Sequence, residues 1–263
     1  MKVLRPPFSY YGGKTMMAKD IIGLMPDDAK TYVEPFAGSL AVLLRKEPHA
    51  AEVVNDLDAR LVAFWRTVRD KTDAITNALS ATPYARDEFN HALETIDTET
   101  DEIEFARKVF VILRQSRKRS TSAKPGNFRG VGGPPRGAGH EFARAVDSLP
   151  RVAERLRNVV IENIDALDLI KRWDKPDTIM YLDPPYVGET RTARDYTVEN
   201  ASVDFHERLI DKIADAQARI ILSGYDHPVY DKLSSWRRVD SVRTTGSTSR
   251  SSIYAVETLW INY

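Results

Sequence analysis

The segment Asp183-Pro184-Pro185-Tyr186 places two hydrogen-bond acceptors and an aromatic ring at the end of an apolar stretch. Thr178–Leu182 is predicted to be a strand, which must end at the prolines because proline cannot continue a sheet ladder. Asp183 supplies a carboxylate, the Pro184 carbonyl supplies a second acceptor, and Tyr186 offers a flat face for stacking. This combination suits a planar substrate that carries an amino group. The alternative is a strand ending in a turn with a satisfied aspartate.

A second candidate site consists of a glycine turn and a later acid. Residues 31–39 are predicted to be a short strand that enters a small-residue turn at Gly38. The next predicted strand, residues 51–56, ends in Asp56, which is 18 positions after Gly38. An acid at that spacing is placed to bind ribose hydroxyls in a nucleotide-type fold. The alternative is that Asp56 only caps the following helix, a role that Asp58 is also placed to fill.

The N-terminal segment Phe8–Thr15 contains the sequence Gly-Lys-Thr, which occurs in phosphate-binding loops. Such a loop needs a glycine where this chain has Phe8, and it needs a preceding apolar strand that is absent here. This excludes a nucleotide-triphosphate site. The two glycines instead predict a turn that brings backbone close to a ligand, flanked by Tyr10 and Lys14. The alternative is a plain turn before an amphipathic helix, residues 15–25, with inward-facing Met16, Met17, Ile21 and Ile22.

The composition is that of a folded protein without thiol chemistry. The chain has 263 residues, of which 42% are hydrophobic, enough for one large α/β domain or one domain with an insert. The lack of cysteine excludes disulfides, thiolate metal sites and a cysteine nucleophile. No apolar run is long enough to cross a membrane, and Met1–Tyr11 has no apolar signal-peptide core. We therefore expect a cytoplasmic protein with no membrane or metal partner.

Charged residues are balanced in number but not in position. Lysine plus arginine and aspartate plus glutamate each total 38, so net charge identifies no partner. Residues 87–104 carry acids and no lysine or arginine, whereas residues 105–140 carry nine lysines and arginines and no acid. Such a basic block predicts a phosphate-binding surface, and the alternative is a solvated helix face beside a surface loop. The candidates are Arg114, Arg117, Lys118, Arg119, Lys124 and Arg129.

Hydrophobic periodicity separates an α/β part from a helical part. Strands are predicted over residues 31–39, 51–56, 158–163, 178–182, 219–224, 237–242 and 253–261, the last two joined by a polar loop. Helices are predicted over 59–70, 168–173 and 205–216, and a further one starts over 40–45 with Ser39 as N-cap. Residues 71–157 show helical periodicity and no convincing strand. Their strongest helix is 105–116, a Gly/Pro-rich loop covers 120–139, and helices 142–149 and 152–156 flank Pro150.

The order of these motifs resembles that of a known family, the Dam-like DNA adenine methyltransferases of bacteria and phages. Four segments carry the resemblance: Phe8-Ser9-Tyr10-Tyr11-Gly12-Gly13-Lys14, Glu34-Pro35-Phe36-Ala37-Gly38-Ser39, Asn55-Asp56 and Asp183-Pro184-Pro185-Tyr186. Residues 257–262 are similar to that family's closing strand. The resemblance covers roughly residues 8–65 and 157–262, and four ordered motifs are more specific than any one of them.

The resemblance implies an α/β fold with a Rossmann-like, S-adenosylmethionine-dependent methyltransferase sheet and an inserted helical DNA-recognition domain. Residues 1–70 and 157–263 would form the catalytic, cofactor-binding domain, and residues 71–156 the helical target-recognition insert. The partner would be double-stranded DNA in a bacterial or phage-infected cytoplasm, and a monomer is favoured. The insert matches the family only through Gly126-Asn127-Phe128, so the resemblance does not carry over a target sequence.

The resemblance also assigns roles to individual residues. Catalysis would rest on Asp183, Pro184 and Tyr186. The cofactor S-adenosylmethionine would contact Tyr10, Lys14, Glu34, Phe36, Gly38, Asp56 and Asp183, with Gly38 near its methionine part and Asp56 at its ribose. The basic candidates above would bind DNA, and no metal is implied. Leu40 stands where many relatives have a further glycine, which predicts a less open turn.

This chemistry fits an exocyclic amine. The adenine amino group is a poor nucleophile because its lone pair is delocalised into the ring. Acceptors at Asp183 and the Pro184 carbonyl would hold both amino hydrogens and favour a localised lone pair, so catalysis is positional and electrostatic. Tyr186 would receive the base after it leaves the helix stack. The alternatives are amino methylation of cytosine or of an RNA base, and a DNA-binding relative without catalysis. Asp183 favours adenine, because cytosine enzymes more often have serine there.

Overall fold

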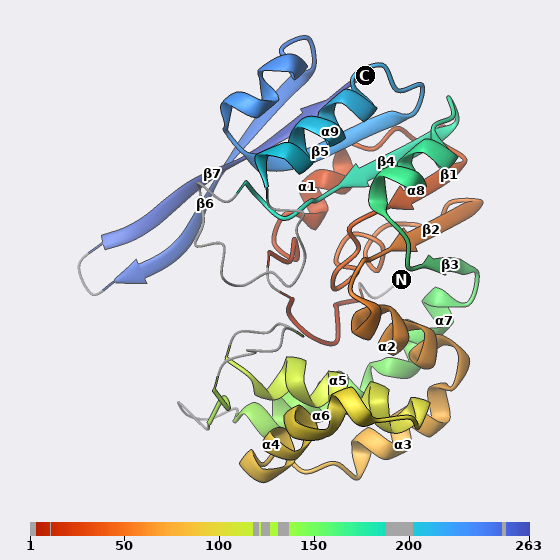
Figure 1. The fold of residues 1–263 in the computed structure, drawn as a ribbon, viewed down its shortest axis with the longest axis vertical. Helices are drawn as coiled ribbons and strands as arrows, with labels where there is room; N and C mark the ends of the chain where they lie inside the picture. The colour runs from red at the N-terminus through yellow and green to blue at the C-terminus, as the bar shows by residue number, and fades with distance from the viewer. Residues whose placement is uncertain are drawn as a thin grey trace. The chain divides into compact units, whose positions relative to one another are not determined.

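The predicted apolar segments form the strands of a mixed sheet (Figure 1). The structure is a computed structural model that describes residues 4–10, 12–117, 121, 127–130, 137–187, 202–248 and 251–263. Within these ranges, seven strands form a sheet in the order β3-β2-β1-β4-β5-β7-β6. They are β1 Thr31–Glu34, β2 Ala51–Asn55, β3 Val159–Glu162, β4 Thr178–Leu182, β5 Arg219–Tyr225, β6 Arg237–Thr248 and β7 Ser251–Ile261.

The parallel strands of this sheet place its topological switch point between β1 and β4. β1 pairs in parallel with β2 on one side and with β4 on the other, and β4 pairs in parallel with β5. The strand order therefore reverses at β1, and ligands of open α/β sheets bind beyond the carboxyl ends of the strands at such a point. All residues of β1 and β4 are buried, as expected for parallel strands with apolar runs. This confirms the predicted Rossmann-like α/β fold.

The chain divides into two compact units. The first comprises Met1–Gly23, Ala37–Pro48 and Asp56–Asn163, and the second comprises Leu24–Phe36, His49–Asn55 and Ile164–Tyr263. Helices of the first unit are α1 Ala18–Gly23, α2 Ala59–Asp70, α3 Thr72–Ser80, α4 Arg86–Thr95, α5 Glu102–Gln115, α6 Ala138–Asp147 and α7 Leu149–Leu156, with the 3-10 helix η1 Ile96–Thr98. Those of the second are α8 Ala166–Trp173, α9 Val203–Ile213 and the 3-10 helix η3 Pro228–Leu233.

Helix α5 is the central helix of the first unit and packs against α2, α3 and α4. It begins where the Asp101 side chain accepts a hydrogen bond from the Glu104 backbone N–H at 2.8 Å, a side-chain N-cap. Its apolar face is buried as predicted, and the Phe110 ring stacks on Phe64 of α2 with centroids 5.6 Å apart. Phe8 stacks on Trp65 at 5.1 Å, which ties the N-terminal segment to the same core.

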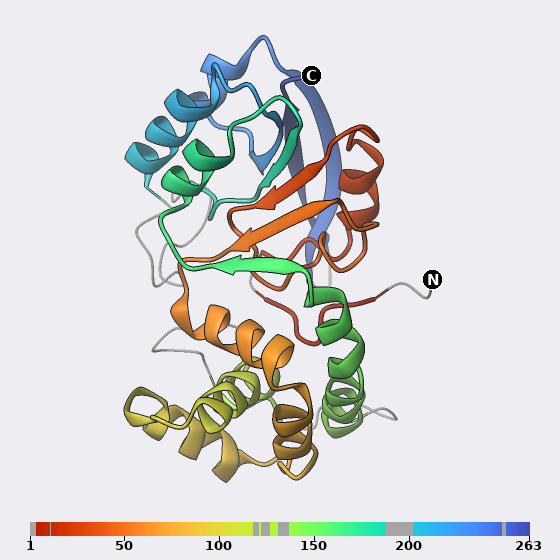
Figure 2. The same cartoon turned by 90° about the vertical axis from the view of Figure 1, so that its right-hand side faces the viewer.

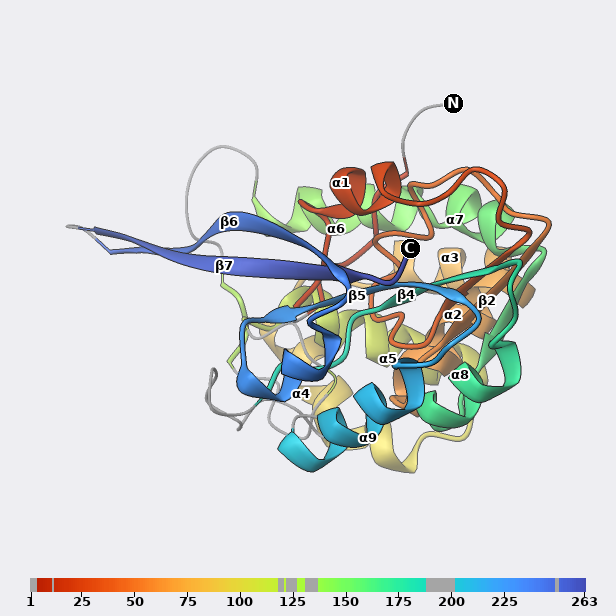
Figure 3. The same ribbon diagram turned by 90° about the horizontal axis from the view of Figure 1, so that it is seen from above.

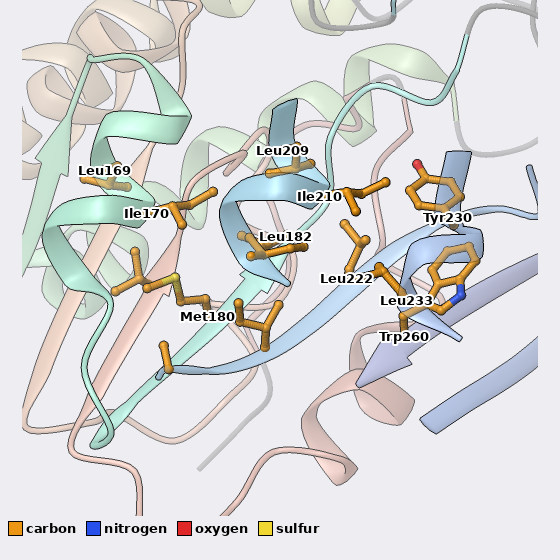
Figure 4. Close-up of a cluster of buried hydrophobic side chains, with 14 of the residues drawn as sticks. Leu169, Ile170, Met180, Leu182, Leu209, Ile210, Leu222, Tyr230, Leu233 and Trp260 are labelled. Carbon is orange, nitrogen blue, oxygen red and sulfur yellow. The ribbon is translucent and has the colours of Figure 1, made fainter. Parts of the chain in front are cut away.

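The second unit is held together by apolar side chains between the sheet and the helices α8 and α9, which lie on the same face of the sheet (Figure 2). Figure 4 shows this cluster, in which residues of both helices meet the side chains of β4 and β5. Its buried members include Leu169, Ile170, Met180, Leu182, Leu209, Ile210, Leu222, Tyr230, Leu233 and Trp260. The cluster fixes β4 immediately before the Asp183 turn.

The helix predicted from Leu40 is wrong, because the residues after the Gly38 turn form successive turns instead. Leu40 has a φ of 58°, in the left-handed region that side chains disfavour. The amides of Arg45 and Lys46 both bond to the Val42 carbonyl, at 3.0 and 3.1 Å, so no regular helical ladder develops. Leu40 thus adopts a left-handed backbone conformation in which glycine is favoured. Many members of the family that this sequence resembles have glycine at this position.

Two other expectations need correction. Met16 does not face inward: it is 79% exposed, and the helix α1 is shorter than predicted. The polar loop predicted after residue 242 is largely strand, because β6 continues to Thr248 and pairs with Ser251 of β7. Figure 3 shows this hairpin extending past the rest of the sheet. Cross-strand backbone pairing overrides the polarity of the sequence here.

Candidate functional site

A glycine turn positions Tyr10 in the first unit. The Gly13 amide donates to the Tyr10 carbonyl at 3.0 Å, and a Cβ at Gly13 would lie 2.9 Å from that oxygen, so the turn requires glycine. The Tyr10 hydroxyl donates to Asp58 Oδ2 at 3.2 Å. Burial, together with the charges of Asp58 and Asp56, raises the pKa of Tyr10 well above its usual value. Tyr10 therefore stays a neutral donor beside two carboxylates.

A hydrogen bond brings the Gly38 turn and Asp56 together. The Gly38 amide donates to Asp56 Oδ2 at 2.8 Å, and the Trp65 indole donates to the Gly38 carbonyl at 3.1 Å. Gly38 has a φ of 50°, and a Cβ there would lie 3.3 Å from the Tyr10 ring. Both the backbone conformation and the close ring favour glycine at this position.

Asp56 is not the cap of the following helix. Asp58 caps α2, since its Oδ1 accepts from the amides of Arg60 and Leu61 at 3.0 and 3.4 Å. The Asp58 amide in turn donates to Asp56 Oδ1 at 3.0 Å. Burial raises the pKa of Asp56 to about 6, opposed by the backbone amides that bind it. Asp56 is half-buried, and its two oxygens offer about four lone pairs to the amides of Gly38, Leu57 and Asp58. The carboxylate can therefore still accept from hydroxyl donors such as those of a ribose.

Three further predicted cofactor residues already have partners within the protein. Lys14 is buried, and its ammonium donates to the Gly12 carbonyl at 2.8 Å. Glu34, the last residue of β1, is buried and accepts from the Tyr32 hydroxyl at 2.8 Å. The Phe36 ring is half-buried and meets Phe205 of α9 edge-on, with centroids 6.2 Å apart.

The catalytic candidate Asp183 is held by a hydrogen-bond chain in the second unit. Ser223 of β5 donates to Asp183 Oδ1 at 2.8 Å, and the Tyr181 hydroxyl lies 3.2 Å from the same Ser223 oxygen. Because the serine proton goes to Asp183, Tyr181 is the donor to Ser223. Ser223 is fully buried, while Asp183 is half-buried. Nothing in the sequence pattern singled out Ser223, which is one polar residue within an apolar strand.

Tyr186 is more enclosed than its predicted stacking role suggests. Its side chain is 4% exposed, its ring meets Tyr225 edge-on at 4.6 Å, and its hydroxyl donates to Glu257 of β7. Burial and the charges of Asp183 and Glu257 raise the pKa of Tyr186 well above its usual value. A base can reach the Tyr186 ring face only after neighbouring atoms move. The one sequence signal for Glu257 was the similarity of residues 257–262 to a closing strand.

Part of the basic block is neutralised inside the first unit. Arg107 pairs with Glu104 at 2.6 Å and with Glu88, and buried Lys108 pairs with Glu99 at 2.6 Å. The acidic segment therefore balances the first turns of the basic block. This pairing removes Arg107 and Lys108, two of the nine basic residues, from any surface available to phosphate.

The remaining basic candidates differ in exposure. Arg117 is exposed, Arg114 is half-buried, and Arg129 pairs with Glu141 at 3.3 Å. A bridge joins the two ends of residues 117–129, which we call the basic loop. The Arg117 amide donates to the Asn127 carbonyl at 3.0 Å, and the Arg129 amide donates to the Gln115 carbonyl at 2.6 Å. Lys118, Arg119 and Lys124 lie outside the described residues.

The part of the chain that the structure describes contains neither a membrane-spanning helix nor a cluster of metal ligands. None of its helices is both long and apolar enough to cross a membrane. Among the same residues, no group of three or more histidine, aspartate or glutamate side chains is placed to hold a metal ion.

The chain matches known methyltransferases along most of its length. The family model of the D12 class N6 adenine-specific DNA methyltransferases matches residues 10–244. The Type II methyltransferase M1.LlaDCHI of Lactococcus lactis subsp. cremoris is 26% identical over 280 residues, which cover 99% of this chain and 96% of that protein. The Type II methyltransferase M.CviBI of Paramecium bursaria Chlorella virus NC1A is 24% identical over 263 residues, covering 92% and 97%.

Among solved structures, a putative methyltransferase, yhhF from Escherichia coli, aligns with 94% of this chain and 80% of its own, at 13% identity and a TM-score of 0.29. The family match contains the Gly38 turn, Asp56 and the Asp183 turn within one continuous span. This chain therefore belongs to the D12 class of N6 adenine-specific DNA methyltransferases, enzymes that methylate the N6 amine of adenine in DNA.

Proposed function

We propose that this enzyme takes its methyl group from S-adenosylmethionine, held by Tyr10, Lys14, Glu34, Phe36, Gly38, Asp56 and Asp183. The observation that carries the proposal is the bond between the Gly38 amide and Asp56, which joins the turn after β1 to the acid after β2. When bound, the sulfonium supplies an electrophilic methyl group. The half-buried Asp56 carboxylate accepts from the ribose hydroxyls, and the Gly38 turn lets backbone approach the methionine part.

At the adenine, Asp183, Pro184 and Tyr186 act as the catalytic residues. Ser223 donates to Asp183 Oδ1 and so orients the carboxylate, which accepts one amino hydrogen of the base. The Pro184 carbonyl accepts the other, so the two acceptors orient the nitrogen lone pair toward the methyl group. Tyr186 stacks on the extruded base, a contact worth about 1–3 kcal/mol per base. The protein contributes position and electrostatics, and no covalent enzyme intermediate forms.

For DNA, residues 71–156 are proposed as the target-recognition insert and residues 1–70 and 157–263 as the catalytic domain of a monomer acting on duplex DNA. The exposed Arg117 at the start of the basic loop supports this assignment. The other proposed DNA contacts are Arg114, Lys118, Arg119, Lys124 and Arg129. Two relatives are named Type II methyltransferases, which supports a role in protecting host sites beside a restriction nuclease.

A methyl-transfer assay tests the proposed donor and substrate together. Purified protein with methyl-labelled S-adenosylmethionine and adenine-containing duplex DNA is expected to yield N6-methyladenine after digestion of the DNA to nucleosides. The matched control is the same duplex with each adenine base replaced by unsubstituted purine, which lacks the 6-amino group, and it should stay unlabelled. Label in cytosine, or in RNA but not in duplex DNA, would contradict the proposal.

The basic loop is tested by replacing Arg117, Lys118 and Arg119 together with alanine. Each phosphate contact contributes about −0.9 to the slope of log affinity against log salt, so the variant should show weaker DNA binding and a flatter slope. Salt titrations of binding to one duplex measure both effects. The matched control replaces the exposed α8 and post-α8 residues Lys171, Arg172 and Lys175, which changes net charge equally. Equal slopes for wild type and the loop variant would remove this segment from the DNA interface.

A further inference from the structure

A buried histidine bonds to the backbone of the catalytic turn. His206 of α9 is fully buried, and its Nε2 lies 2.9 Å from the Pro185 carbonyl oxygen. Its other ring nitrogen, Nδ1, lies 2.9 Å from the hydroxyl of Tyr230 in η3. All three residues belong to the second unit. No motif or spacing in the sequence points to His206 or Tyr230.

The partners of His206 determine its protonation state. A carbonyl oxygen can only accept, so Nε2 carries the proton and donates to Pro185. Burial lowers the pKa of His206, which keeps the ring neutral, and Nδ1 is then an acceptor for the Tyr230 hydroxyl. Burial and the charge of Asp183 raise the pKa of Tyr230, so that hydroxyl keeps its proton. The hydrogen bonds therefore run in one direction: the Tyr230 hydroxyl donates to His206, and His206 donates to the Pro185 carbonyl.

Packing around Tyr230 holds these two hydrogen bonds in place. The Tyr230 ring lies against Trp260 of β7, with centroids 4.4 Å apart and a tilt of 32°. Gly224 of β5 makes room for both rings, because a Cβ there would lie 3.1 Å from the Tyr230 hydroxyl and 3.3 Å from Trp260. Gly224 directly follows Ser223, the residue that donates to Asp183. Two adjacent residues of β5 thus support the turn: Ser223 binds Asp183, and Gly224 makes room for Tyr230, the partner of His206.

We propose that His206 is a positioning residue that holds the Asp183–Tyr186 turn through the Pro185 carbonyl. Pro184 and Pro185 have no backbone N–H, so this turn cannot be fixed by its own amide donors at those positions. Side-chain donors replace them: Ser223 binds Asp183 at one end, and His206 binds Pro185 at the other. The inference rests on the proposed function, in which the Pro184 carbonyl, one residue earlier, accepts an amino hydrogen of adenine.

Two amide substitutions separate the two nitrogens of His206. In His206→Gln the side-chain NH₂ reaches the position of Nε2 and can donate to Pro185, whereas in His206→Asn it reaches only the position of Nδ1. The Gln variant should keep kcat within about threefold of wild type, as one replaced hydrogen bond predicts. The Asn variant should lose about 10²-fold in kcat, since misplacing a reacting group by about 1 Å costs that much. In both, KM for S-adenosylmethionine should stay near the wild-type value.

Equal kcat for the Gln and Asn variants would overturn the proposal, and so would a loss in the Asn variant confined to KM. If the Asn variant fails to fold, nitrogen NMR of histidine-labelled wild-type protein still decides: His206 protonated at Nε2 supports the proposal, and protonation at Nδ1 overturns it. Failure of the proposed function would look different. Wild-type protein would then transfer no methyl group from S-adenosylmethionine to adenine, whatever the NMR result.

Discussion

Asp183→Ala is expected to abolish methyl transfer, with a loss of about 10³-fold or more in the single-turnover rate. In the proposed mechanism the carboxylate orients the target amine, and Ser223 fixes the direction of that carboxylate by donating to Oδ1. In the alanine variant the buried Ser223 hydroxyl can still donate to the Leu182 carbonyl, which lies 3.4 Å away. The melting temperature should therefore change little. Rapid-quench measurement of methylated adenine, at saturating cofactor and DNA, isolates the chemical step.

Tyr186→Phe is the matched control for this variant. It keeps the aromatic ring against Tyr225 and removes only the hydroxyl that donates to Glu257, so most of the turnover should remain. A near-normal single-turnover rate in Asp183→Ala would show that amine orientation does not depend on this carboxylate. The mechanism proposed above would then be wrong.

Asp56→Ala is expected to weaken S-adenosylmethionine binding by about 10- to 100-fold, the range for losing charge-assisted hydrogen bonds of about 1.5–3 kcal/mol. The substitution removes the proposed acceptor for the ribose hydroxyls and also removes the partner of the Gly38 amide, so the turn itself loses a constraint. Calorimetric titration of the cofactor measures the affinity. Asp56→Asn is the matched control, because it keeps an oxygen for the Gly38 amide but loses the charge. Unchanged affinity in Asp56→Ala would contradict the ribose assignment.

The same assignment predicts how cofactor affinity depends on pH. The pKa of Asp56 is raised to about 6, above the value of about 3.9 for an unfolded aspartate. Ribose hydroxyls donate most strongly to the ionised form, so affinity should be full above pH 6 and fall as pH drops through that value. For folding without cofactor the sign is opposite: a raised pKa contributes stability below about pH 4 that is lost as pH rises through 6. Asp56→Asn should flatten both dependences.

Local rules were enough to predict the Asp183–Tyr186 turn and most strands of the parallel sheet. Proline ends a ladder, so β4 had to stop at Leu182, and the apolar runs of buried strands are visible without any partner. Capping is equally local, so the sequence could show that Asp58 is placed to cap α2. With Asp58 as the cap, Asp56 is not needed for that role. These features depend on residues within a few positions of one another, and the sequence alone determined them.

Only the tertiary structure decided what holds the Asp183–Tyr186 turn and which basic side chains are available to a partner. Ser223 is 40 positions from Asp183, and His206 is 21 from Pro185, so neither contact follows from periodicity. Arg107 belongs to a basic block in sequence, yet Glu88 and Glu104 neutralise it in the folded unit. Leu40 begins turns instead of a helix because its φ is 58°, a backbone conformation that its own propensity does not favour. Long-range packing sets each of these outcomes, because it brings together groups whose separation along the chain carries no signal.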